Sequence, residues 1–325
     1  MFSFIIPLQS SNNYLLENLD NFKKIIKLYN SYSIEIILLP DVKIKGLESY
    51  KLNLRQIVTG PIPPPRKRDI GVLNALYEII CFIDEDSYIS KEWIDLCYTN
   101  HILENYGAVV GPGIIPRNDP FIAQIFSTFY SSTLFSLFPE RYLSLNKKFE
   151  VMDWPTVNFT IKKKYFLKVN GFDTDIWPGE DTYFCKKLAN KQIKIIYDGK
   201  MYVYHHRRNS LKKYLVQIYR YGFNRGKLFI LLGISMQIKF YLFFIILFVF
   251  FFISILNFSS FNHHVITFSF IFFIYIVLGT LESLFRTKKL LSLFNIILAP
   301  ISHLSYLIGF INGIINKKRN TKLGR

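Results

Sequence analysis

Three consecutive acids follow an apolar run in the segment FIDEDS, and they are the first residues of this chain suited to chemistry. Asp84, Glu85 and Asp86 come directly after a segment that predicts a buried strand. Three carboxylates this close repel one another unless a cation lies among them. Carboxylate oxygens suit Mg²⁺ and Mn²⁺, and Mg²⁺ commonly takes one or two of them together with substrate phosphates. The triplet predicts a site for a divalent metal and a phosphorylated ligand; the alternative is a solvated acidic turn.

A second acidic pair, Glu180 and Asp181, opens an amphipathic helix in the segment WPGEDTYFCKKLA. An acid at a helix start complements the helix dipole, which is the structural alternative. A carboxylate at a helix start that faces a metal site across a cleft is also suited to take a proton as a general base. We therefore expect both residues in the catalytic set.

Two histidines, His205 and His206, stand in the segment VYHHRRNS after a predicted strand. Successive residues on a strand point to opposite faces, so only one of the two can face a site. A neutral imidazole there would join Asp84 and Asp86 as a metal ligand. The sequence leaves open which histidine does so. The two arginines that follow suit pyrophosphate binding, as guanidinium groups do.

These residues need a scaffold in which strand ends meet, and the first 210 residues predict one. Apolar runs predict strands, and helical spacing of apolar residues predicts helices between them. The strands fall at 2–7, 34–40, 54–60, 79–84, 107–113 and 193–198, and the helices at 13–30, 69–78 and 91–105. Such alternation is typical of an α/β domain with a mostly parallel, Rossmann-like sheet and flanking helices. Because ligands bind at the carboxyl ends of such strands, Pro7 and Asp41 are expected to face the same ligand.

The charge of the chain is concentrated in its last third. Residues 211–325 carry fourteen Lys and Arg but one acid, Glu282, within a chain of net charge +17. A basic chain ordinarily suggests nucleic acid as a partner. Here the basic residues lie beside long apolar runs, so anionic membrane lipids are the expected counter-charge and nucleic acid is not expected.

The same region predicts membrane segments. No charged residue occurs from Phe240 to Leu281. Because a spanning helix needs about 20 apolar residues, spans are expected at about 240–257 and 264–281. A further uncharged stretch, 290–316, is broken by a proline and predicts either a third span or a re-entrant segment. The membrane region as a whole is then 240–316.

The basic segments predict the orientation in the membrane. The loop at 286–289 and the tail at 317–325 favour the cytoplasmic side, as does the domain at 1–210. The first residues, MFSFIIP, do not resemble a signal peptide. We therefore expect a multi-pass protein of the inner (cytoplasmic) membrane with its catalytic domain in the cytoplasm.

Four segments in order resemble a known family. FSFIIP, KRDIG…FIDEDSYISKEW, NFTIKKKYFLKVNGFDTDIWPGEDTYFCKKL and YVYHHRR are similar to family 2 glycosyltransferases of the GT-A fold. They most resemble the membrane-associated bacterial and archaeal members that build surface or lipid-linked glycans. The resemblance covers about residues 1–230. It implies inverting transfer from a nucleotide-sugar donor, with Mg²⁺ or Mn²⁺ as cofactor.

The resemblance also implies roles for individual residues. Asp86 matches the residue that holds the metal on the diphosphate, and Asp84 matches the one that faces the nucleotide. Asp181 matches the catalytic base. The full set of donor-binding residues expected is Pro7, Asp41, Arg68, Asp69, Asp84 and Glu85.

The segment QIYRY partly matches the QxxRW signature of processive polysaccharide synthases, with Tyr221 in place of Trp. On a helix Gln217 shares a face with Arg220 or Tyr221, a candidate acceptor side. The surrounding 211–239 is basic, aromatic and amphipathic, and we interpret it chiefly as an interfacial segment.

Three functions remain open at this point. The expected one is transfer of a sugar to a hydroxyl of a lipid-linked glycan or polysaccharide. The alternatives are a polyprenyl-phosphate sugar synthase and a processive polysaccharide synthase. A phosphate acceptor is already ionised and needs no base, so the Glu180-Asp181 pair favours a hydroxyl acceptor.

Overall fold

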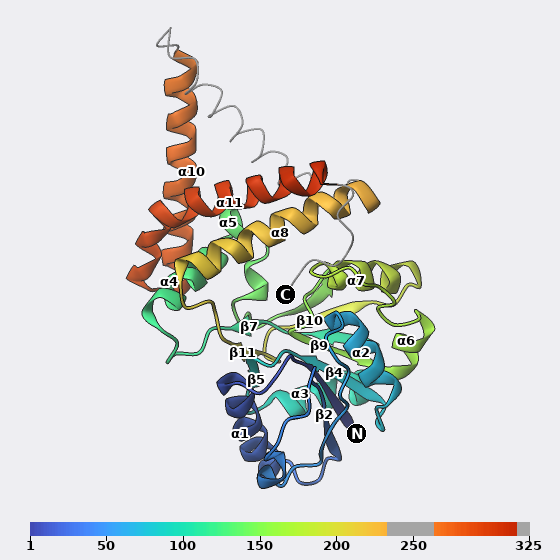
Figure 1. Ribbon diagram of the computed structural model, residues 1–325. Helices are drawn as coiled ribbons and strands as arrows, with labels where there is room; N and C mark the ends of the chain where they lie inside the picture. The colour runs from blue at the N-terminus through green and yellow to red at the C-terminus, as the bar shows by residue number, and fades with distance from the viewer. Residues whose placement is uncertain (233–262, 317–325) are drawn as a thin grey trace. The chain divides into compact units, whose positions relative to one another are not determined.

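The computed structural model describes residues 1–232 and 263–316, and the contacts divide the chain into two units (Figure 1). The first unit contains Met1–Arg117 and Glu140–His206. The second contains Asn118–Pro139 and the chain from Arg207 onward. Residues 118–139 thus group with the C-terminal helices, although the sequence pattern placed them in a 1–210 domain. The predicted span at 240–257 and the basic tail at 317–325 lie outside the described residues.

An eight-stranded sheet forms the centre of the first unit, in the order β3-β2-β1-β4-β9-β6-β10-β8. Its strands are β1 (Phe2–Pro7), β2 (Ile34–Leu39), β3 (Leu54–Gln56), β4 (Ile79–Ile83), β6 (Ala108–Val110), β8 (Lys148–Val151), β9 (Asn158–Lys162) and β10 (Ile195–Asp198). The first four strands pair in parallel, with β1 between β2 and β4. Their carboxyl ends therefore meet at one edge, as the sequence predicted.

The sheet is less parallel than expected, because β9 lies between β4 and β6 and is antiparallel to both. The sequence analysis did not predict this strand, since Asn158 and Thr160 interrupt its apolar residues. Both side chains are buried and hydrogen-bonded: Asn158 Nδ2 donates to the carbonyl of Met201 at 2.7 Å, and Thr160 donates to that of Val109 at 2.8 Å. Polar residues are thereby accommodated in the middle of the sheet.

Helices cover both faces of this sheet, and two separate apolar cores lie against it. The helices are α1 (Asn13–Leu28), α2 (Pro64–Leu73), α3 (Trp93–Tyr98), α6 (Lys163–Lys168) and α7 (Glu180–Asn190). A π-helical turn, Thr99–Leu103, extends α3. Helix α1 begins where the side chain of Asn12 accepts a hydrogen bond from the N–H of Leu15. Its apolar face buries Leu15, Leu19 and Phe22.

Helix α2 differs from its prediction, and the difference matters for the site. The sequence pattern predicted a helix at 69–78, with residues 61–68 outside it. The helix instead begins at Pro64 and ends at Leu73. Proline is favoured at the first helical positions, where the missing N–H would have no partner. The basic residues Lys67 and Arg68 therefore lie on a helix, and both are buried.

A small second sheet joins β5 (Ser87–Ile89), β11 (Val203–His205) and β7 (Gly113–Ile114). Strand β11 is antiparallel to β5, and His205 is paired with Ser87. Tyr88 and Tyr204 stack across the two strands with ring centroids 5.0 Å apart. This sheet brings the end of the acid triplet beside the histidine pair.

The described part of the second unit is helical. Its helices are α4 (Phe121–Tyr130), α5 (Thr133–Ser136), α8 (Leu211–Leu232), α10 (His263–Thr287) and α11 (Asn295–Ile315), with a short 3-10 helix at Leu290–Phe294. Among the described residues, two segments are long and apolar enough to cross a membrane, Ser269–Thr287 and Leu290–Ile315. The first overlaps the predicted span at 264–281.

A buried polar network fastens the end of α10 to α4. Ser283 Oγ donates to the carbonyl of Thr128 at 2.6 Å and accepts from Asn295 Nδ2 at 3.1 Å. Glu282, the one acid of 211–325, accepts from the hydroxyl of Ser132 at 2.7 Å and pairs with Arg286. These bonds explain why residues 118–139 belong to the second unit.

Candidate active site

Arg68 of α2 links the two acidic segments that the sequence singled out. Its Nη2 donates to Asp84 Oδ1 at 2.8 Å, and its Nη1 donates to Glu180 Oε1 at 3.0 Å. The side chains of Arg68 and Glu180 are 4% and 5% exposed, whereas that of Asp84 is 35% exposed. A buried guanidinium with two carboxylates thus holds the start of α7 next to the end of β4.

Asp181 follows in the first turn of α7 and is partly buried. Its Oδ1 accepts a hydrogen bond from the hydroxyl of Thr156 at 2.9 Å, and its Oδ2 has no hydrogen-bond partner among the described residues. Burial, followed by the charge of neighbouring Glu180, raises the pKa of the Asp181 carboxyl well above its ordinary value. The negative charge of Asp84 acts in the same direction. A carboxylate with a raised pKa and a free oxygen is suited to accept a proton.

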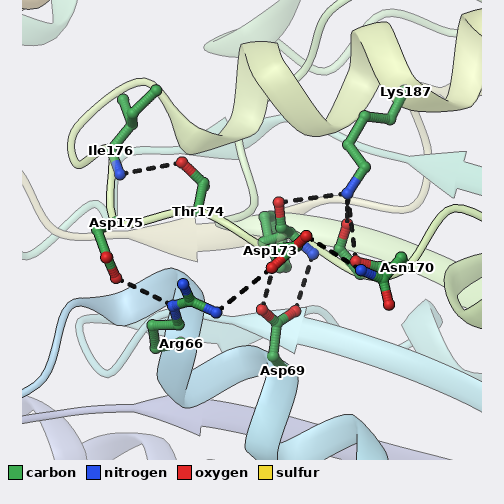
Figure 2. Close-up of polar contacts among 10 residues, drawn as sticks. Arg66, Asp69, Asn170, Asp173, Thr174, Asp175, Ile176 and Lys187 are labelled. Atoms are coloured by element: carbon green, nitrogen blue, oxygen red, sulfur yellow. Dashed lines mark hydrogen bonds and ion pairs between the residues drawn. The ribbon is translucent and has the colours of Figure 1, made fainter.

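The loop that leads into α7 is held in place by charged side chains (Figure 2). Both oxygens of Asp69 accept backbone hydrogen bonds, from Phe172 at 2.8 Å and from Asp173 at 3.0 Å. Arg66 pairs with Asp175 at 3.0 Å, and Lys187 donates to the carbonyl of Gly171 at 2.7 Å. Gly171 has a φ of +54°, and a side chain there would meet Asp69. Asp69 therefore positions this loop; a contact with the donor stays a prediction.

Lys67 occupies the edge where β1 and β2 end. Its Nζ donates to the carbonyls of Leu8 at 2.5 Å and Leu39 at 2.9 Å, and it forms an ion pair with Asp41. The side chain is 1% exposed. Pro7, the last residue of β1, is buried beside this lysine's carbonyl partners. The structure thus brings Pro7 and Asp41 to one strand edge, as expected, around a cation that the sequence analysis did not assign.

The acid triplet itself divides between different partners. Asp84 faces Arg68, while Asp86 Oδ1 lies 3.3 Å from Nε2 of His205. Burial, followed by the charge of Asp86, raises the pKa of Glu85 to about 7. His206 points elsewhere: its Nε2 lies 3.1 Å from Glu17, and its ring packs on Tyr14. Of the two histidines, His205 is the one beside the triplet.

These positions allow a test of the expected metal site. Within residues 1–232 and 263–316 no group of three or more His, Cys, Asp or Glu side chains is arranged to hold a metal ion. Asp86 and His205 nevertheless converge, and their oxygen and nitrogen donors suit a divalent cation. Such a cation often takes one or two protein ligands and completes its coordination shell with phosphate oxygens and water. The pair of Asp86 and His205 is therefore suited to hold a divalent cation.

The residues expected on the acceptor side lie in the second unit. Gln217, Arg220 and Tyr221 are on α8, where Gln217 is partly exposed and the other two are exposed. The carbonyl of Arg220 accepts from Asn224 Nδ2 at 2.7 Å. Their role toward an acceptor stays a prediction.

Two residues of the site were not found from the sequence. Lys67 carried a usable signal, since it belongs to a basic run next to the predicted strand edge, but that run lay outside the predicted helix. Thr156 carried none, because a single threonine in a polar segment resembles any other. Its contact with Asp181 depends on the register of the chain that enters β9.

Comparisons with known proteins bear on the family and the fold. A family model described as "Glycosyl transferase family group 2" matches residues 79–311. Poly(ribitol-phosphate) beta-N-acetylglucosaminyltransferase TarS of Staphylococcus aureus is 28% identical over 128 residues, which are 35% of this chain and 22% of TarS. The chain therefore spans less than a quarter of the length of that relative.

Two solved structures share the fold. One is mannosyltransferase PcManGT from Pyrobaculum calidifontis, in complex with GDP-Man and Mn²⁺, with a TM-score of 0.58 at 13% identity. The match covers 98% of this chain and 88% of the PcManGT chain. The other is GalNAc-T7 with UDP, GalNAc and Mn²⁺, with a TM-score of 0.50 at 13% identity. The match covers 70% of this chain and 50% of the GalNAc-T7 chain. At this identity the likeness concerns the fold, and it confirms the α/β architecture of GT-A type expected from the sequence.

Proposed function

The chain belongs to glycosyl transferase family group 2, and we propose that it transfers a sugar from a nucleotide-sugar donor to a hydroxyl of a lipid-linked or surface glycan. The observation that carries the proposal is the Arg68 bridge. It joins Asp84, at the predicted donor side, to Glu180, next to the predicted base. The relative TarS is by name a poly(ribitol-phosphate) beta-N-acetylglucosaminyltransferase, which supports transfer of a sugar to a hydroxyl-bearing polymer.

The donor is held at the ends of β1, β2 and β4. Lys67 orders the carbonyls of Leu8 and Leu39 there, and Asp84 is fixed by Arg68. Asp86 and His205 would hold a divalent cation, Mg²⁺ or Mn²⁺. When bound, such a cation neutralises negative charge on a diphosphate leaving group.

Asp181 acts on the acceptor. Thr156 orients the carboxylate through Oδ1, so Oδ2 is left to accept the proton of the attacking hydroxyl. The new bond forms from that oxygen to the anomeric carbon, and the bond to the diphosphate breaks on the opposite side. The anomeric configuration is thereby inverted.

The second unit supports an assignment to the membrane. Lys212, Lys213 and Arg220 are exposed on α8, and α10 contains a segment apolar enough to span. Basic residues near an anionic leaflet are favourable, and the positive-inside rule assigns them to the cytoplasmic face. The site then works at the cytoplasmic face of the inner membrane, where a lipid-linked acceptor is available.

The proposal is tested with the purified full chain and a panel of nucleotide sugars. We expect release of nucleoside diphosphate with one donor, stimulation by Mn²⁺ or Mg²⁺, and loss of the activity in excess EDTA. The product formed on a glycan acceptor is analysed by NMR, and inversion at the anomeric carbon is expected. A retained configuration contradicts the assigned mechanism, and full activity in EDTA contradicts the metal.

A further inference from the structure

Helices α8 and α11 pack backbone against backbone. Two Gly-xxx-Gly motifs face each other, Gly222 with Gly226 and Gly309 with Gly313. A Cβ atom built on Gly222 would lie 2.0 Å from the carbonyl oxygen of Tyr306, and one on Gly309 would lie 2.1 Å from that of Tyr219. Cβ atoms built on Gly226 and Gly313 would lie 2.3 and 2.0 Å from carbonyl oxygens of the opposite helix. No larger residue fits at these four positions, so the two helix axes are close.

Side-chain hydrogen bonds continue this contact along both helices. The hydroxyls of Tyr214 and Ser302 are 3.0 Å apart, and Ser305 Oγ donates to the carbonyl of Leu215 at 2.9 Å. Asn312 Nδ2 donates to the hydroxyl of Tyr219 at 3.1 Å. The residue numbers of the contacting partners increase in the same direction along both helices, so α8 and α11 run parallel. The orientation of one in a membrane therefore fixes the orientation of the other.

Helix α8 is a poor membrane-spanning helix. Lys212, Lys213 and Arg220 are exposed along it, and Arg225 and Lys227 are partly exposed. Basic side chains in the hydrocarbon core are strongly unfavourable. At the headgroup level the same residues face anionic lipid, which is favourable. Helix α8 is thus stable along the surface of a leaflet and not across it.

Helix α11 presents one continuous apolar stripe on the side away from α8. Its members recur every three or four residues and are all exposed or partly exposed: Ile297, Ile301, Leu304, Ile308, Ile311 and Ile315. This is the pattern of a helix with one face in lipid. The composition alone would allow α11 to span. The opposite face of α11, however, packs on helix α8, which carries basic residues.

Helix α10 differs from the pair. Figure 1 shows it extending away from α8 and α11, which run side by side near its C-terminal end. Its exposed residues include Phe270, Phe273 and Leu278, and it holds no charged residue before Glu282. If α10 crosses the bilayer, a helix pair that runs across its direction lies along the surface.

We infer that α8 and α11 form one surface platform, which lies in the plane of the membrane in the headgroup region of the cytoplasmic leaflet. The isoleucine stripe of α11 enters the acyl chains, and the basic residues of α8 face anionic headgroups. The stretch at 290–316, left open by the sequence, then does not cross the bilayer. The inference concerns membrane topology and does not depend on the transferase activity.

The first experiment tests sidedness in intact cells and inverted vesicles. The buried Cys81, Cys97 and Cys185 are replaced by Ala, and single cysteines are introduced as Leu290→Cys and Asn316→Cys, which flank α11 and are exposed. Both cysteines should react with a membrane-impermeant maleimide from the same, cytoplasmic side. Reaction from opposite sides shows that α11 spans the bilayer and overturns the inference.

The second experiment measures depth with the full chain in proteoliposomes of phosphatidylcholine and phosphatidylglycerol. Single cysteines at Ile297, Leu304 and Ile315 carry a fluorophore, which is quenched by lipids that bear a spin label near the headgroup or deep in the acyl chain. We expect the shallow quencher to dominate at all three positions. A profile that is deepest at Leu304 and shallow at both ends indicates a span. Absence of quenching at all three indicates that protein covers the stripe, and either outcome contradicts the platform.

Discussion

Arg68 is the residue on which the geometry of the site depends most. It is buried with one carboxylate on either side, and its Nε has no acceptor in the described part of the chain. Removing one partner of a buried ion pair is costly, because the remaining charges are left without compensation. The same helix offers a matched comparison in Arg66, whose pairs with Asp173 and Asp175 are exposed.

We expect Arg68→Met to lower the free energy of unfolding of the first unit by about 3–5 kcal/mol. Arg66→Met should lower it by less than about 1 kcal/mol, since exposed pairs contribute little. Trp93, Trp154 and Trp177 all lie in the first unit, so tryptophan fluorescence during urea unfolding reports on that unit alone. If the double variant Arg68→Met/Glu180→Gln is no more stable than Arg68→Met, the bridge to Glu180 has been overestimated.

Asp181→Asn should reduce turnover by about 10²–10⁴-fold, the range for a lost general base. Affinity for the donor should hardly change, because Asp181 faces the acceptor in the proposed mechanism. Burial raises the pKa of this carboxyl. The wild-type rate should therefore rise with pH in a range above the ordinary pKa of an aspartate, where the Asp181 carboxyl loses its proton. The variant should not show this rise. Undiminished turnover in the variant would favour an acceptor that is already ionised, such as a polyprenyl phosphate.

Asp86→Ala should abolish activity and leave the stability of the first unit nearly unchanged, because a partly exposed side chain is removed without a cavity in the core. His206→Ala provides the comparison, since the imidazole of His206 lies beside Glu17 and only the backbone of His206 contacts the triplet. Mn²⁺-dependent activity is measured for both variants. Equal loss in the two would contradict the assignment of His205 as the metal-side histidine.

At the scale of single residues, the sequence predicted the charged groups better than their partners. Asp84, Glu180 and Asp181 stand out because acids cluster at element ends. That Asp84 and Glu180 share Arg68, and that Asp181 contacts Thr156, follows from how α2 and the chain before β9 pack, which no local pattern encodes. The role of Asp69 in positioning the loop before α7, through two backbone N–H groups, was likewise not predicted; its contact with the donor stays a prediction.

At the scale of elements, strands and helices with regular apolar spacing were predicted well, and those that depend on tertiary contacts were not. Strands β1, β2 and β4 are uninterrupted apolar runs. Strand β9 buries polar residues that are satisfied only by neighbours distant in sequence. Helix α2 begins at Pro64, inside a proline run that, taken alone, also suits an extended chain.

His101 links the π-helical turn after α3 to β9, and it makes the stability of this contact depend on pH. Nδ1 lies 3.0 Å from the carbonyl of Tyr106, and Nε2 lies 2.8 Å from the hydroxyl of Thr160. Burial lowers the pKa of the imidazole to about 4. The folded chain therefore holds it neutral, while the unfolded chain takes up a proton below a pH of about 6.5.

Stability of the first unit should consequently fall as the pH decreases from about 6.5 to about 4. The loss due to this group is at most about 3.5 kcal/mol, from about 1.4 kcal/mol per pKa unit. Urea unfolding followed by tryptophan fluorescence at several pH values tests this. His101→Gln should be less stable at neutral pH but should lose less on acidification; an unchanged slope would assign the effect to other groups.

The packing of α8 on α11 leads to a further prediction at this scale. Gly309→Leu should lower the thermal unfolding temperature of the second unit markedly, because the side chain would meet the backbone of α8. Ile308→Leu, one residue earlier on the lipid-facing stripe, should leave it nearly unchanged. Equal effects of the two substitutions would indicate that the close approach of these helices does not contribute to stability.

At the scale of the whole molecule, composition separated a soluble-type N-terminal part from a basic, apolar C-terminal part, and the structure divides the chain in a related way. The exception is 118–139. This segment is short, apolar and rich in aromatic residues, so in sequence it resembles any core helix of an α/β domain. Its partners are Ser283, Asn295 and Tyr214, which are more than seventy residues away.

That exception has a consequence for how the protein is made. Phe126 stacks on Tyr214 at 4.2 Å, and Phe129 and Phe135 pack near His303, so α4 and α5 are complete only with helices at the far end of the chain. A ribosome needs on the order of ten seconds to reach those helices after α4 emerges. During that interval the nascent aromatic segment has no native cover. We expect it to recruit chaperones or the insertion machinery before the predicted membrane spans at 240–257 and 264–281 have been translated.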